Sequence, residues 1–130
     1  MQRQCEMFKI PDAEIRCLLL FGEDKYLTAK GISNKLNVVK SRVTRIVDGL
    51  IQKKLIQKIP DPEDSRVVLL SLTSEGQTKL KEVNDFMLDL HAQVLSQITS
   101  KQRDIFLHNL EVLGLCMETV NERLRQGLPR

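Results

Sequence analysis

The sequence predicts a mainly α-helical fold with one small β-hairpin. Residues 55–72 read as two short strands around a turn rich in proline and charge, LIQKIPDPEDSRVVLLSL, because prolines favour an exposed turn over a central strand. Two helix-like segments, 28–36 and 40–53, lie directly before it. Apolar residues recur every three or four positions from Leu80 onward, which indicates two long C-terminal helices. Helix, tight turn, helix and hairpin in this order are the layout of a winged helix-turn-helix.

The composition fits one small folded domain. At 130 residues and 42% hydrophobic content, the chain can bury one core but not two independent ones. We therefore expect a winged helix-turn-helix over 10–76 and a helical dimerisation region over 77–126, joined by 1–9, within one continuous domain. No apolar run approaches the roughly 20 residues that span a bilayer, and MQRQCEMFKI lacks the apolar core of a signal peptide. These features predict a cytoplasmic protein without membrane contact.

The first predicted helix begins at Pro11, whose missing N–H costs nothing in a first turn, and runs to about Phe21. Thr28 can cap the second helix through its hydroxyl. The third helix, 40–53, follows Val39, which cannot cap it. Its apolar residues form one stripe that we expect to be buried: Val43, Ile46, Val47 and Leu50.

The opposite face of segment 40–53 is polar and basic. It comprises Lys40, Ser41, Arg42, Thr44 and Arg45. Residues 28–72 carry nine basic and four acidic side chains, a net charge of +5 in a chain whose total is +3. A recognition helix presents its N-terminal residues to base edges in the major groove, so this cluster predicts contact with double-stranded DNA. The alternative interpretation is an ordinary amphipathic helix that happens to be basic.

The turn of the hairpin holds a further candidate for DNA contact. Arg66 lies at the base of the second predicted strand, where a long cation can enter a minor groove. Asp64 is expected to pair with it, because strand alternation puts both side chains on one side. Lys58, before the turn, is a weaker candidate.

Two long helices are predicted after the hairpin. Thr73 or Ser74 can cap the first, and Ser74 with Gln77 fits a capping box; Thr99 with Gln102 fits another. The first helix has an apolar seam of Leu80, Val83, Met87, Leu90 and Val94, and the second has one of Phe106, Leu110, Leu113, Met117, Val120 and Leu124. One small winged domain offers too little surface to cover both seams, so we interpret them as contacts of a homodimer.

The three cysteines, Cys5, Cys17 and Cys116, are odd in number and widely spaced, which argues against a zinc clamp and a disulfide framework. Cys17 and Cys116 lie among apolar residues and are expected in the core. Cys5 is a candidate redox thiol, since nearby Arg3 and Lys9 favour its thiolate. The sequence has no phosphate-cradling glycine loop, nucleophile elbow or metal-ligand spacing, so it predicts no enzyme, cofactor or metal.

Four stretches resemble the MarR family, the multiple-antibiotic-resistance type of transcription regulators. They are LT at 27–28, VTRIVDGL at 43–50, LIQKIPDPEDSR at 55–66 and LTSEG at 72–76, and the resemblance covers about residues 10–100. It implies an obligate homodimer on a pseudo-palindromic operator, usually a repressor, that a small ligand or oxidant often releases. By position it puts Lys40, Ser41, Arg42, Thr44 and Arg45 in the recognition helix and Arg66 in the wing.

The chain departs from the family pattern at several positions. About ten residues precede the first predicted helix, where family members usually carry a long helix. Gly31 replaces the acidic residue that completes a capping box with Thr28. Lys54 stands where glycine is frequent, which predicts mild strain if the position needs a positive φ. A winged-helix module that binds protein rather than DNA is the alternative function.

Overall fold

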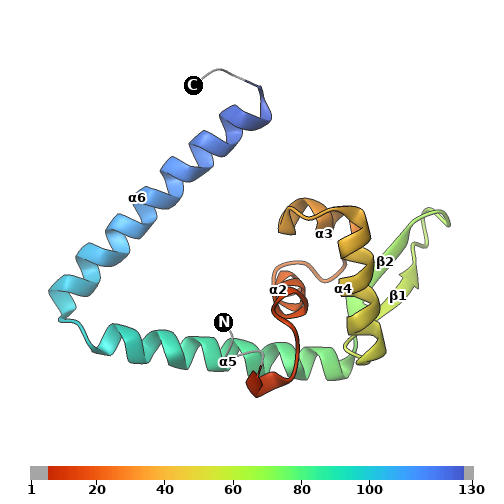
Figure 1. Cartoon of the computed structure of the whole chain (residues 1–130), viewed down its shortest axis with the longest axis horizontal. Helices are drawn as coiled ribbons and strands as arrows, with labels where there is room; N and C mark the ends of the chain where they lie inside the picture. The colour runs from red at the N-terminus through yellow and green to blue at the C-terminus, as the bar shows by residue number, and fades with distance from the viewer. Residues whose placement is uncertain (1–5, 128–130) are drawn as a thin grey trace. The chain divides into compact units, whose positions relative to one another are not determined.

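The computed structural model describes residues 6–127 (Figure 1). The elements are the helices α2 (Asp12–Leu20), α3 (Ala29–Leu36) and α4 (Lys40–Gln52), the strands β1 (Ile56–Pro60) and β2 (Val68–Leu72), and the helices α5 (Ser74–Ser96) and α6 (Ser100–Arg125). This order confirms the predicted fold class, mainly helical with one hairpin. The chain divides into two compact units, residues 1–87 and 88–130, so that the division falls within α5.

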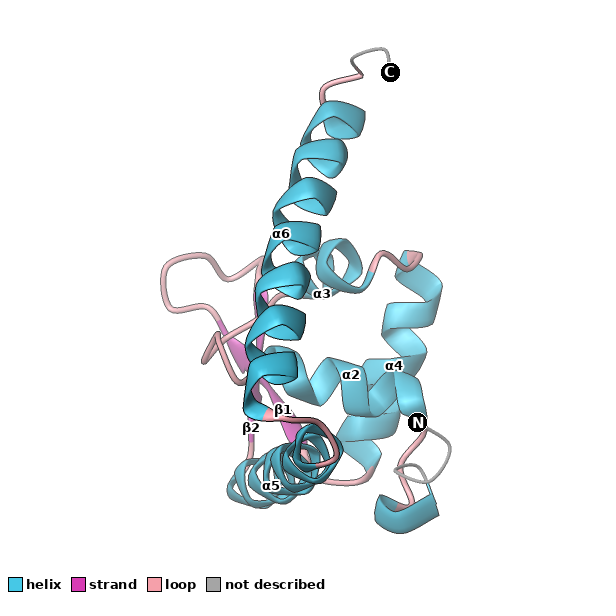
Figure 2. Ribbon diagram, turned by 90° about the vertical axis from the view of Figure 1, so that its left-hand side faces the viewer, coloured by secondary structure: helices cyan, strands magenta, loops and turns pink. Residues whose placement is uncertain are grey.

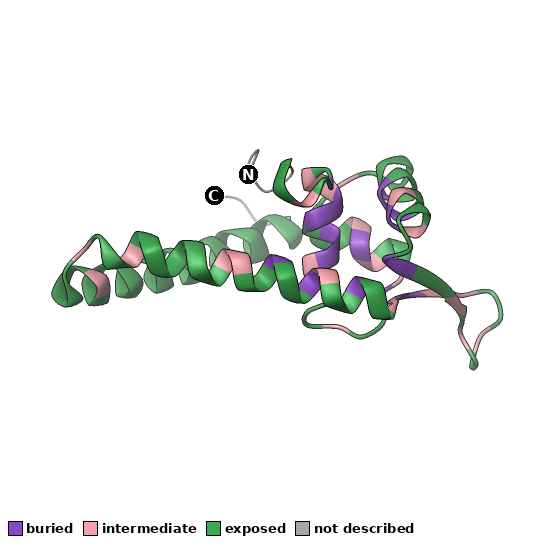
Figure 3. Ribbon diagram, turned by 90° about the horizontal axis from the view of Figure 1, so that it is seen from below, coloured by how far each residue is buried: buried purple, intermediate pink, exposed green. Residues whose placement is uncertain are grey.

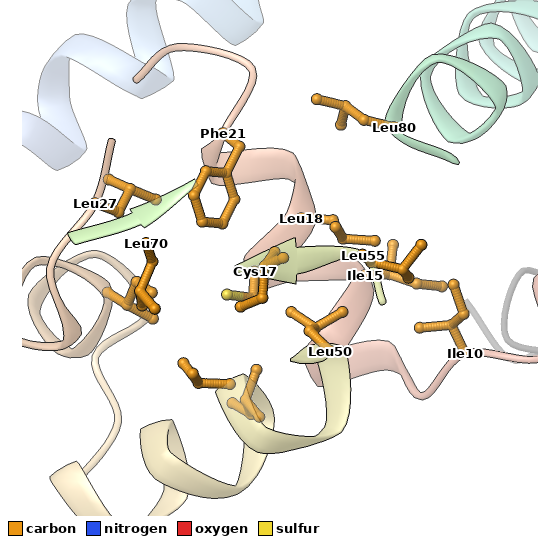
Figure 4. Close-up of a cluster of buried hydrophobic side chains, with 14 of the residues drawn as sticks. Ile10, Ile15, Cys17, Leu18, Phe21, Leu27, Leu50, Leu55, Leu70 and Leu80 are labelled. Atoms are coloured by element: carbon orange, nitrogen blue, oxygen red, sulfur yellow. The ribbon is translucent and has the colours of Figure 1, made fainter. Parts of the chain in front are cut away.

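The core of the first unit lies among α2, α3, α4, the hairpin and the N-terminal half of α5 (Figure 4). The predicted stripe of α4 is confirmed, since Val43, Ile46, Val47 and Leu50 are all buried. Leu18 of α2 and Ile32 of α3 are completely buried and belong to the same cluster. Burial of these side chains, at roughly 1.5–3 kcal/mol each, holds the three helices together.

Local signals set the ends of α3 and α4. The Thr28 hydroxyl accepts a hydrogen bond of 3.0 Å from the amide of Gly31, which confirms the predicted cap. Val39 occupies the N-cap of α4 without a side-chain hydrogen bond to it. At the other end, Lys54 has φ 61°. The amide of Leu55 bonds to the carbonyl of Leu50, so the helix ends in a Schellman motif with a lysine where glycine is usual.

The hairpin is antiparallel, with Ile56 opposite Leu72 and Pro60 opposite Val68 (Figure 2). Leu27, which precedes the cap of α3, joins it by an isolated bridge to Leu70. Their backbone hydrogen bonds measure 3.0 and 2.7 Å. The hairpin is thereby bonded to the segment that leads into the helix-turn-helix, and its position relative to α3 is fixed.

Helix α5 is capped by Thr73, whose hydroxyl accepts a 3.0 Å hydrogen bond from the amide of Gly76. The expected capping box of Ser74 with Gln77 is therefore wrong: the helix begins at Ser74, and the capping residue is the threonine before it. The box of Thr99 with Gln102 at the start of α6 is confirmed in both directions, at 2.9 and 3.2 Å.

The described part of the second unit, 88–127, contains the C-terminal end of α5 and the whole of α6. The buried residues of α5 lie in its N-terminal half (Figure 3), and no residue of α6 is buried. Cys116 is exposed, so the expected core position is wrong within this single chain, because the apolar face of α6 is not covered. None of the helices in the described part of the chain is long and apolar enough to cross a membrane.

Candidate nucleic-acid interface

The first two turns of α4 present the polar cluster predicted from the sequence. All five of its members are exposed: Lys40, Ser41, Arg42, Thr44 and Arg45. They lie opposite the buried stripe, because residues three and four apart share one face of a helix. The Thr44 hydroxyl donates a 3.1 Å hydrogen bond to the carbonyl of Lys40, which holds it against its own helix and leaves its lone pairs as acceptors.

A half-buried ion pair connects the end of α4 to α2, and the sequence reasoning missed it. The Glu14 side chain is only 9% exposed, and its Oε1 lies 2.9 Å from the Lys53 ammonium at the end of α4. Gly49 makes room for this carboxylate, since a Cβ there would lie 2.9 Å from Glu14 Oε1. A glycine in the interior of a predicted helix was the available signal of a close approach.

A hollow of about 620 Å³ lies between the N-terminal part of α2 and the exposed face of α4. Glu14, Ser41, Arg42 and Arg45 are among its lining residues. The two arginines are therefore flanked by an acidic group that already has a partner in Lys53. Their guanidinium groups stay available to an external anion or base edge.

The wing carries an ion pair that the sequence predicted. Asp64 accepts from the Arg66 amide at 3.0 Å, from its Nε at 3.1 Å and from its Nη2 at 3.3 Å. These hydrogen bonds hold the pKa of the Asp64 carboxyl below its ordinary value. The cause differs from the predicted strand alternation, because both residues lie in the turn before Val68, where β2 begins.

Arg66 remains accessible despite this pair, with 89% of its side chain exposed. It lies in the predicted turn, two residues before β2 begins at Val68. Lys58 is exposed on β1, opposite Leu70. The turn itself is shaped by Asp61, whose Oδ1 accepts from the Glu63 amide at 2.9 Å.

The cysteines do not extend the interface. Cys17 is buried, as expected, and burial, together with the charge of Glu14, raises its pKa to about 12, so the thiol stays protonated. Cys5 lies outside the described residues. Within residues 6–127, no group of three His, Cys, Asp or Glu side chains is arranged to hold a metal ion.

Comparison with known proteins identifies the family. The sequence pattern of the MarR family matches residues 10–68. The chain is 31% identical over 110 residues to the HTH-type transcriptional repressor MdtR of Bacillus subtilis (strain 168), and the match covers 85% of this chain and 71% of MdtR. The chain belongs to the MarR family. The resemblance read from the four sequence stretches is thereby confirmed.

Other similar proteins match this chain over part of their own length. The HTH-type transcriptional repressor YetL of B. subtilis is 25% identical over 97 residues, which cover 75% of this chain but only 58% of YetL. The crystal structure of YusO from B. subtilis has a TM-score of 0.74 at 29% identity, covering 87% of this chain and 80% of that one. Streptococcus pneumoniae FabT, solved in complex with DNA, shares the fold with a TM-score of 0.77 at 22% identity, covering 85% and 78%.

Proposed function

We propose that this MarR-family chain is a sequence-specific regulator that binds double-stranded DNA as a homodimer and represses transcription. The observation that carries the proposal is the exposed polar cluster on the first two turns of α4: Lys40, Ser41, Arg42, Thr44 and Arg45. The names of MdtR and YetL, both transcriptional repressors, support it.

Each group has a role that its chemistry suits. Arg42 can bond the O6 and N7 of a guanine bidentately in the major groove. Lys40, Arg45 and the hydroxyl of Ser41 suit phosphate oxygens, which set the register of a protein on a duplex. The Thr44 hydroxyl, which donates to the Lys40 carbonyl, suits a donor group on a base edge. Arg66, with Lys58 as a weaker contributor, suits the flanking minor groove, where negative potential is concentrated. In a symmetric dimer, the two recognition helices would enter grooves about 34 Å apart on a pseudo-palindromic operator.

The dimer is proposed from α6. Ten large apolar side chains of this helix are 46–65% exposed: all six of the predicted seam, together with Ile105, Leu107, Val112 and Leu115. A helix apolar on several sides needs cover from other helices, and a contiguous apolar surface of this kind marks an interaction site. A second copy supplies matching helices, since a two-fold interface uses the same patch from both partners.

Relief of DNA binding by a small ligand or an oxidant is part of the proposal, supported by family membership alone. A titration of the complex with candidate ligands and with peroxide, using a Cys5→Ser variant as control, separates the two routes. Loss of binding with peroxide in the parent but not in this variant would assign the oxidant route to Cys5.

The test of DNA binding is a selection from genomic fragments, followed by fluorescence anisotropy on the enriched duplex across salt. A dimer with 6–10 phosphate contacts predicts a log–log slope of about −5 to −9. Arg66→Ala should weaken binding, and Arg42→Ala should relax base preference by about 1–3 kcal/mol per half-site. Lys81→Ala, a change at an exposed lysine of α5, is the matched control and should leave the affinity unchanged.

Two outcomes would count against the proposal. Unchanged affinity and base preference in Arg42→Ala would remove the recognition-helix assignment. Binding to no duplex even at low salt, together with a stable protein partner in a pull-down, would favour a winged-helix module for protein interaction. If the chain is a dimer, sedimentation equilibrium should give twice the chain mass of 14.9 kDa. The Leu113→Glu variant should sediment with the mass of a single chain.

A further inference from the structure

Val39 is the most exposed large hydrophobic residue in the described part of the chain, at 69%. Within residues 6–87, the only other exposed large hydrophobic residues are Met7, Tyr26 and Val68. Its neighbour Val38 packs against the core, and Val43 one turn later is 1% exposed. The fold therefore does not use the Val39 side chain for its own packing.

The Val39 side chain also does not stabilise α4 as a helix cap. It occupies the N-cap of α4 with φ −70° and ψ 154°, the extended geometry from which a Ser, Thr, Asp or Asn side chain would bond the first turn. Its carbonyl accepts from the amides of Arg42 and Val43 at 3.0 and 3.1 Å, but its side chain accepts nothing. Three other helices of the described chain, α3, α5 and α6, have a threonine at this place, and each uses it as a cap.

An apolar side chain at this place has one natural partner in a major groove. Val39 directly precedes Lys40, Ser41 and Arg42, the residues proposed to meet DNA. The edge of an A·T pair in the major groove carries one apolar group, the C5-methyl of thymine, and small apolar side chains contact it. The three residues that follow Val39 end in an ammonium, a hydroxyl and a guanidinium, so Val39 is the one residue of this short stretch that offers methyl groups for that contact.

We propose that Val39 reads a thymine methyl in each half-site of the operator, beside the base contact of Arg42. The inference rests on the proposed function and deepens it, because it names the base edge that the site selects. It predicts a thymine at one position of each half-site where removal of a single methyl group weakens binding.

The test replaces thymine by deoxyuridine in the selected operator, one symmetric pair of positions at a time, and measures affinity at fixed salt. At one symmetric pair of positions, the affinity of the parent protein should fall about four-fold for each of the two methyl groups removed. Val39→Ala should bind the thymine and deoxyuridine duplexes equally at that pair. Val68→Ala, which truncates a valine of the hairpin that is 49% exposed, is the matched control and should keep the parent's sensitivity.

Val39→Ser separates recognition from stability. A serine there supplies the missing cap, so the melting temperature should rise, on the order of 4 °C. The same variant should lose the sensitivity to deoxyuridine. If Val39 had only a structural role, Val39→Ser could not make the protein more stable and also abolish its discrimination between thymine and deoxyuridine at one operator position.

The result that overturns the inference is distinct from failure of the proposed function. If the parent binds its operator with a steep salt dependence, but no thymine position shows a methyl effect that depends on Val39, only this inference falls. If the parent binds no duplex at all, the proposed function falls and the inference with it.

Discussion

The hydroxyl of Thr73 donates a 2.6 Å hydrogen bond to the carbonyl oxygen of Lys54. Lys54 follows the C-terminal end of α4 and has φ 61°, and Thr73 caps α5. This one contact therefore connects the end of the proposed recognition helix, α4, to the start of α5. The Thr73 amide adds a 3.1 Å bond to the carbonyl of Leu55. The LTSEG stretch is thus a structural joint as well as a sequence signature.

Replacing Thr73 by valine keeps the shape but removes both hydroxyl interactions. We expect the free energy of unfolding to fall by about 2 kcal/mol, from a lost helix cap and a lost hydrogen bond. Urea unfolding followed by circular dichroism measures it. The control is Thr78→Val, whose hydroxyl bonds only to the Ser74 carbonyl of its own helix and is exposed, so its effect should stay within about 0.5 kcal/mol.

Gly76 allows α5 to approach the backbone of Leu55. A Cβ on Gly76 would lie 1.9 Å from the Leu55 carbonyl oxygen, a distance that backbone atoms cannot accept. Gly76→Ala should therefore destabilise the protein by about 3 kcal/mol or more, as overpacking does when the neighbour is rigid. Gly114→Ala is the contrast, since a Cβ there meets nothing within 4 Å. Equal midpoints of urea unfolding for the two variants would contradict the close approach.

The Glu14–Lys53 ion pair should contribute more to the free energy of unfolding than an exposed ion pair does. Lys53→Met leaves a carboxylate that is only 9% exposed without its partner, and we expect a loss of about 1–3 kcal/mol. Lys81→Met breaks a pair whose side chains are 79% and 60% exposed, so it should cost about 0–1 kcal/mol. A double-mutant cycle with Glu14→Gln isolates the interaction, and a coupling energy near zero would show that the pair contributes nothing.

The wing pair predicts a titration. Because hydrogen bonds from Arg66 lower the pKa of Asp64 in the folded protein, its midpoint should lie below the ordinary value of 3.8. The stability from this pair is fully present above that value and is lost as the pH falls through the folded pKa. Carbon-detected NMR of the Asp64 carboxyl measures the midpoint, which should rise in Arg66→Ala. An unchanged midpoint in that variant would mean that Arg66 does not bond Asp64 in solution.

Features with a local cause were predictable from the sequence. The stripe of α4 follows from helical spacing, and the caps at Thr28 and Thr99 follow from a hydroxyl before an amphipathic run. The hairpin follows from two short strands around prolines. Even the strained Lys54 was foreseeable, because a Schellman motif needs a positive φ after the helix. Each of these depends on residues a few positions apart.

What the tertiary structure decided involves residues far apart in the chain. The Lys53–Glu14 pair joins side chains 39 positions apart, and the Thr73–Lys54 bond spans 19. Periodicity carries no information about such partners, since packing of whole elements brings them together. Cys116 shows a related limit. Its apolar neighbours predicted a core position, yet burial depends on what covers a helix, and within the described residues nothing buries any residue of α6.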